Sequence, residues 1–192
     1  MIDKTLGFLL DELNGYLSLH LQSHEKVAVL SSLANADGSP VHGLNGKLIL
    51  TLVNIGKEAA APALGVPVRS EGGGYVRNAA PLNLNLYIMV SASFGSYMDS
   101  LGMLSRALGF FQGRPSFDAQ SCAGRFPPNL DKLSAELVSI STQEMNNLWG
   151  ILGAKYLPSA VFKLRMITLQ QGWADAMVPE VSKPEVNVAR RE

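Results

Sequence analysis

The chain has 192 residues, a length typical of one globular domain with short appendages. Its 16 basic and 16 acidic residues give zero net charge, which argues against binding a nucleic-acid backbone, because such binding needs a surplus of Lys and Arg. The single Cys122 excludes an internal disulfide, and no run of about 18 apolar residues suggests a membrane span.

Residues 2–23 are predicted to form a helix with leucines along one side: Leu6, Leu9, Leu10, Leu13, Leu17 and Leu21. Gly7 and Gly15 each weaken this helix by about 1 kcal/mol relative to Ala, so it depends on docking the leucine stripe. Acidic residues lie among these leucines, which is unlike a signal peptide. The chain is therefore expected to be cytoplasmic when it is synthesised.

Two strands and a long loop are predicted next. The first strand contains Val27 and Val29, and turn residues make 35–40 a loop. The strand Lys47–Ile55 is apolar on both alternating sets, which predicts a strand that is covered on both faces, or covered on one face and packed on a partner chain. More than half of residues 59–81 are Ala, Gly or Pro, with neither a helix nor a strand period. Such a long loop is usually functional or disordered.

The middle of the chain predicts a strand, a helix and another strand. Pro81 opens the first strand, whose apolar and polar residues alternate, so one buried and one more polar face are expected. The helix begins near Ser96 and ends at Arg114-Pro115, with a predicted inner stripe of Met98, Leu101, Leu104, Leu108 and Phe111. Residues 116–129 are irregular, and alternation around Ala135 predicts a further strand.

Residues 139–169 carry the clearest local signals. Ser141 and Glu144 have the spacing of a capping box, which predicts that a helix begins there. Gly153 is suited to end this helix. The helix has one apolar face, made of Met145, Leu148, Trp149 and Leu152. A tight link follows, and alternation from Ala160 to Ile167 predicts a strand.

The pattern fails after residue 169, where prolines interrupt a series of valines. We therefore predict a domain over residues 1–172 and an extended tail over 173–192, poorly ordered in the free protein.

No catalytic, cofactor or metal constellation emerges from the sequence. His20 and His24 share a helix face, but His42 lies in a loop, and a zinc site would need further ligands at matching spacing. Gly72–Gly74 does not link a strand to a helix as a phosphate loop does. Ser96 follows a glycine without the rest of a nucleophile elbow, so a helix N-cap is the better interpretation.

Two segments carry a resemblance. Residues 81–93 with the helix over 101–111 form the first, and residues 143–166 form the second, with Leu52-Val-Asn-Ile upstream. The run Leu-Trp-x-x-Leu-Gly-x-x-Tyr-x-Pro-Ser, from Leu148 onward, is its most specific part. In this order, over residues 2–169, they resemble the N-terminal domain family of cap proteins, or tail terminators, from phage-tail-like extracellular contractile injection systems.

The resemblance implies an α/β fold of the α+β type, with one mixed, mainly antiparallel sheet flanked by helices. It also implies a structural cap without catalysis or cofactor: a six-membered ring that ends the inner tube and anchors the last sheath ring. The implied partners are copies of the chain, the tube protein, the sheath protein and a possible paralogous cap subunit, with no nucleic acid or membrane. The cap would assemble in the cytoplasm and become part of a particle that can be released. The alternative is a soluble ligand-binding or enzymatic domain of the same pattern.

Two sets of residues follow from this interpretation. The structural motif, expected to hold the last helix on the sheet, is Trp149, Tyr156, Pro158, Ser159 and Phe162. The candidate interface residues lie in the tail and in the 59–78 loop: Val178, Val181, Val186, Val188, Arg190, Arg191, Arg69, Tyr75 and Arg77. We expect the tail to add as a strand to the sheet edge of a sheath or cap neighbour, and the loop to face tube or sheath.

Overall fold

The computed structural model describes residues 1–58, 67–69, 75–78, 82–122, 124–128, 130, 132–169 and 174–178. The chain divides into two compact units, each described here by itself. The first takes Met1–Ala59 and Asn83–Thr168, and the second takes Ala60–Leu82 and Leu169–Glu192. The predicted division between residues 172 and 173 stays a prediction.

The first unit is built on a mixed, mainly antiparallel sheet, as predicted. Its spatial order is β1 (Ala28–Leu30), β2 (Lys47–Lys57), β5 (Leu82–Ser93), β8 (Ser159–Leu169), β7 (Lys132–Val138) and β6 (Ser116–Asp118). Strands β1 and β2 pair in parallel, whereas β2–β5, β7–β8 and β6–β7 pair antiparallel. The second unit adds a small sheet that the sequence did not predict, in the order β3 (Pro67–Arg69), β4 (Tyr75–Asn78) and β9 (Ala174–Val178).

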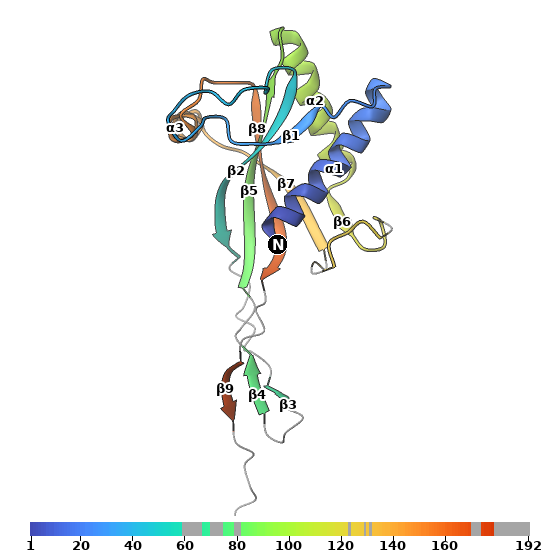
Figure 1. The fold of residues 1–192 in the computed structure, drawn as a ribbon, viewed down its shortest axis with the longest axis vertical. Coiled ribbons are helices and arrows are strands. Elements are labelled where there is room, and N and C mark those ends of the chain that lie inside the picture. The colour runs from blue at the N-terminus through green and yellow to red at the C-terminus, as the bar shows by residue number, and fades with distance from the viewer. Residues whose placement is uncertain are drawn as a thin grey trace, which may run out of the picture. The chain divides into compact units, whose positions relative to one another are not determined.

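The three predicted helices are confirmed: α1 (Ile2–Leu21), α2 (Tyr97–Gly113) and α3 (Thr142–Leu152). Helices α1 and α2 lie on one side of the large sheet and α3 on the other (Figure 1). Consecutive residues of β8 mark the two faces. Val161 packs in a cluster with Trp149 of α3, while the ring of Phe162 lies 4.1 Å from that of Phe111 in α2.

Strand β5 differs from the prediction because both of its faces are buried. Asn85 is 3% exposed, and Met89 and Ser91 are fully buried on the face predicted to be more polar. The reason is the layer beyond that face, where Met89 packs with Ile49, Trp149 and residues from the segment after β1. Apolar and polar residues therefore alternate along β5, but buried and exposed positions do not.

The buried stripe of α2 also differs from the prediction. Met98 is 74% and Leu101 36% exposed, whereas the buried residues are Ser100, Met103, Ala107, Phe110 and Phe111. This helix has two apolar stripes, and the packing of α1 decides between them. The ring of Phe110 lies 5.5 Å from that of Tyr16, and a side chain at Gly109 would come within 3.5 Å of the Tyr16 hydroxyl.

Two segments predicted to be irregular contain short strands. The prediction of a loop over 59–81 is wrong for β3 and β4, and residues 116–129 contain β6. These strands have three or four residues, too few for a period, and β4 finds its partner β9 in the distant C-terminal segment. The rest of 59–81 lies outside the described residues.

One edge of the large sheet is closed by a side chain. The Asn14 side-chain amide donates to the Ala28 carbonyl oxygen at 3.0 Å, and the Ala28 N–H donates to the Asn14 oxygen at 2.9 Å. Asn14 is only 8% exposed. It therefore replaces a neighbouring strand at this point of β1, which prevents pairing with another chain there.

The start and end of α3 agree with the sequence. The Glu144 N–H donates to the Ser141 hydroxyl oxygen at 3.2 Å, and the Ser141 N–H donates to the Glu144 carboxylate at 2.7 Å. Gly153 ends the helix with φ 63° and ψ 19°, in the left-handed region that glycine enters without strain.

The capping box makes the start of α3 sensitive to acid. Hydrogen bonds from the Ser141 backbone, and then from its side chain, hold the pKa of Glu144 below its ordinary value of 4.5. Because the folded-state pKa is lowered, the stabilisation is present above pH 4.5 and is lost as the pH falls through the lowered pKa. An NMR titration of the Glu144 carboxyl carbon should show this lowered midpoint, and Ser141→Ala should raise it. Identical midpoints in the two proteins would contradict the assignment.

Candidate interaction surfaces

The described residues offer no metal cluster. No group of three or more His, Cys, Asp or Glu side chains among them is arranged to hold an ion. The His20 ring makes a hydrogen bond with the Tyr16 carbonyl oxygen at 2.9 Å, an ordinary contact within one helix. Within the same described ranges, no helix combines the length and apolar character needed to cross a membrane.

The small sheet brings several predicted interface positions together. Tyr75 of β4 is registered with Arg69 of β3 on one side and Val178 of β9 on the other. Arg77 is two residues beyond Tyr75, so its position falls on the same face of the sheet. Four predicted interface positions therefore share one face, two of them arginines. The other five, Val181, Val186, Val188, Arg190 and Arg191, lie outside the described residues.

Most of the predicted structural motif lies where α3 meets the sheet. Trp149 is 6% exposed, and its ring makes an edge contact with that of Tyr156, with centroids 5.5 Å apart. The Pro158 carbonyl accepts a hydrogen bond from the Ala92 N–H of β5 at 3.0 Å. The Ser159 hydroxyl lies 3.9 Å from the sulfur of Met145 in α3.

Contrary to the prediction for this motif, Phe162 does not contribute to holding the last helix on the sheet. It is 2% exposed, and its ring packs on Phe111, on the α2 face of the sheet. It therefore holds α2 and not the last helix, because side chains alternate between faces along β8 and Val161 is the residue that faces α3.

Exposed apolar side chains gather on and beside α2. Tyr97, Met98 and Leu101 at its first turns are 65%, 74% and 36% exposed. Leu137, near the end of β7, is 55% exposed. A groove of about 560 Å³ lies between α2 and β7 and is lined by Ser105, Leu108, Gly109, Phe111, Gln112, Ala135, Leu137 and Phe162. The apolar groove, with exposed Leu137 in its lining, is a candidate interaction surface.

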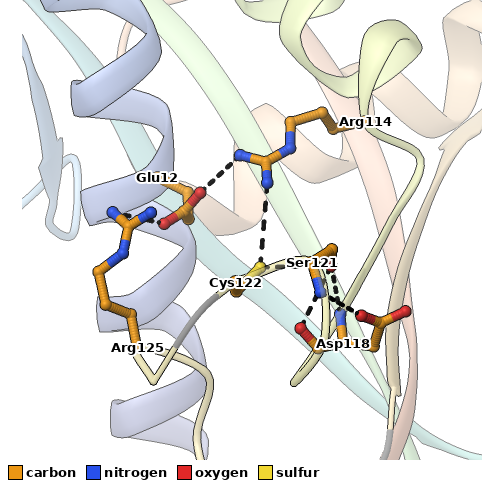
Figure 2. A network of polar contacts seen from close by, with 6 residues as sticks. All are labelled: Glu12, Arg114, Asp118, Ser121, Cys122 and Arg125. Atoms are coloured by element: carbon orange, nitrogen blue, oxygen red, sulfur yellow. Dashed lines mark hydrogen bonds and ion pairs between the residues drawn. The ribbon is translucent and has the colours of Figure 1, made fainter.

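A buried carboxylate ties the segment after α2 to α1 (Figure 2). The side chain of Glu12 is 3% exposed and accepts from Arg114 at 2.6 Å and from Arg125 at 2.9 Å. Arg114 also lies 5.4 Å from the centre of the Phe117 ring and 4.0 Å from the sulfur of buried Cys122. We call Glu12, Arg114 and Arg125 the Glu12 clasp.

No local sequence pattern predicts the Glu12 clasp. Glu12 is 102 residues from Arg114 and still farther from Arg125, so neither helical nor strand spacing relates it to them. Glu12 is one of the acidic residues among the leucines of α1, and its burial was not predicted from the sequence. Its burial follows from how the segment 114–126 packs across α1.

The fold is that of tube-terminating cap proteins. The sheath/tube terminator of the extracellular contractile injection system PVC, in its extended state, is similar with TM-score 0.56 and 11% identity, over 95% of this chain and 64% of that one. The tube-terminating cap of the anti-feeding prophage is similar with TM-score 0.58 and 13% identity, over 96% of this chain and 60% of that one. This chain thus spans less than two thirds of either protein. No curated protein matches it.

The family follows from the sequence match. The model of the Pvc16 N-terminal domain matches residues 6–183. The chain belongs to this family, which confirms the resemblance found in the sequence.

The Glu12 clasp predicts an asymmetric response to mutation. Arg114→Met with Arg125→Met leaves the buried Glu12 carboxylate unpaired and should lower the free energy of unfolding by about 3 kcal/mol. Adding Glu12→Gln should recover much of this loss, because no charge remains buried. Urea unfolding of the purified proteins measures both effects.

Arg165→Met is the matched control. Arg165 pairs with Glu136 at 3.5 Å and lies 4.0 Å from Glu58, and the side chains of Arg165, Glu136 and Glu58 are 46%, 61% and 28% exposed. Its loss should cost less than about 1 kcal/mol. Equal losses for the clasp and the control would contradict the importance of the buried carboxylate.

Proposed function

We propose that this chain is a structural cap of a contractile injection system, ending the inner tube and anchoring the last sheath ring. The observation that carries the proposal is the family match over residues 6–183. The similarity to the PVC sheath/tube terminator and to the anti-feeding prophage cap supports it, since both cover at least 95% of this chain.

The assembly we propose is a ring of six copies. Neighbours in a closed ring meet through two different surfaces, and these surfaces must not repel each other electrostatically. A net charge of zero satisfies this requirement. The exposed residues Tyr97, Met98, Leu101 and Leu137 supply apolar area for such contacts.

The proposed partners beyond the ring are the tube protein, the sheath protein and a paralogous cap subunit. The face of the small sheet that carries Arg69, Tyr75, Arg77 and Val178 is the surface we assign to tube or sheath. The role needs neither catalysis nor a cofactor. The cap assembles in the cytoplasm and leaves the cell as part of the particle.

Electron microscopy of particles from cells with and without this chain tests the proposal. Loss of the chain should give sheathed tubes of uncontrolled length, or particles without terminal density, because polymerisation then has no stop. The same cells expressing the chain from a second copy of its gene are the control. Particles that remain capped and of normal length without the chain would overturn the proposal and reopen the search for a ligand-binding role.

Charge reversal tests the small sheet. Arg69→Glu with Arg77→Glu should reduce retention of the chain on purified particles, because both positions share the face assigned to tube or sheath. Arg106→Glu with Lys155→Glu, in the first unit, is a control with the same change in charge. Retention is measured by quantitative mass spectrometry of particles, and equal retention of the two variants would contradict the assignment.

A further inference from the structure

The outer edge of β7 is only partly covered by β6. The pairs are Asp118 with Lys132, Phe117 with Leu133 and Ser116 with Ser134. The Ala135 N–H then donates to the carbonyl oxygen of Pro115 at 2.9 Å. Proline has no N–H to return the bond, so the ladder stops there and the Ala135 carbonyl points outward.

Leu137 continues this open edge. Alternate residues of a strand point their N–H and C=O groups to the same side, so those of Leu137 point outward like those of Ala135. Toward β8, Leu137 lies opposite Phe162, one residue beyond the Glu136–Lys163 pair. The last residues of β7 therefore present an open edge, which is absent at Ala28 of β1 because Asn14 satisfies both backbone groups there.

The open edge adjoins the apolar groove between α2 and β7. Leu137 lies on the same face of the sheet as Phe162, against which Phe111 of α2 packs. Phe162 and Phe111 are only 2% and 3% exposed, whereas Leu137 is 55% exposed. A strand paired with Leu137 would direct every second side chain into this groove of about 560 Å³. Leu108 and Phe111 would then contact an apolar side chain of the added strand.

We propose that the edge of β7 at Ala135–Val138, with its groove, binds the C-terminal segment 185–189 of a neighbouring copy of this chain as an added strand. The proposal rests on the proposed ring. It assigns the acceptor edge for the tail and commits to a second copy as the partner.

The composition of the segment fits this site. Val186 and Val188 are two residues apart, so both face the same side of a strand and suit an apolar groove. Pro184 precedes the segment and no proline lies within it, so each of its N–H groups can pair. Arg190 and Arg191 follow directly, and beside the open edge lies the Glu136 carboxylate, which is 61% exposed and 3.5 Å from Arg165.

The contact is also consistent with a ring. Each copy carries the open edge of β7 and the segment 185–189, two different surfaces that generate a head-to-tail contact between identical subunits. Main-chain hydrogen bonds would supply affinity, and the valines in the groove would supply specificity.

Disulfide trapping in assembled particles tests the proposal. Two full-length chains with different tags are co-expressed with the particle genes, one carrying Leu137→Cys and the other Val186→Cys or Val188→Cys. Directly opposed positions in adjacent strands are about 4.5–5.5 Å apart at Cβ, close to disulfide distance. A mixed disulfide between the two tagged chains is expected on mild oxidation. Native Cys122 is 1% exposed and gives little background.

Leu19→Cys replaces Leu137→Cys in the matched control, because Leu19 is 79% exposed on α1 and away from the groove. It should give no mixed disulfide. Leu137→Lys, at an exposed position that tolerates a charge without unfolding, should reduce retention of the chain on particles, as should deletion after Glu180.

The outcomes separate this proposal from the cap role. Normally capped particles without a mixed disulfide would overturn the docking and leave the cap role standing. A disulfide from Leu137→Cys to the sheath protein would also overturn it. Failure of the cap role shows independently, as normal tube ends in cells that lack the chain.

Discussion

Strand β5 must be buried on both faces, and this requirement sets where the helices of the first unit lie. Leu86 and Ile88 are fully buried toward one side, while Met89 and Ser91 are fully buried toward the other. A sheet of this kind needs a layer on each face. Helices α1 and α2 form one layer and α3, with the segment after β1, forms the other (Figure 1).

The sequence predicted those parts of the fold that local chemistry determines. The capping box of Ser141 and Glu144, the stop at Gly153 and the alternation in β8 lie within a few residues of the features they specify. The buried stripe of α2 was not predictable in this way. Two apolar stripes compete on that helix, and the choice depends on Tyr16, some ninety residues away in α1.

The same distinction explains the candidate surfaces. The tail and the 59–78 segment could be picked out by composition alone, and the structure then placed Arg69, Tyr75, Arg77 and Val178 on one face. The open edge at Leu137 carried no sequence signal, because it arises from the length of β6 and from Pro115. A residue that ends one strand thus determines the exposure of another, and only the pairing reveals this.

The two edges of the large sheet differ in whether their outward backbone groups already have hydrogen-bond partners. At β1, a buried Asn14 satisfies the outward groups of Ala28, so that edge cannot easily pair with another chain. At β7, the covering strand β6 stops early beside an apolar groove, and the Glu12 clasp holds the chain on both sides of β6, through Arg114 before it and Arg125 after it. By anchoring the chain before and after β6 to α1, the clasp supports the strand that covers part of the outer edge of β7.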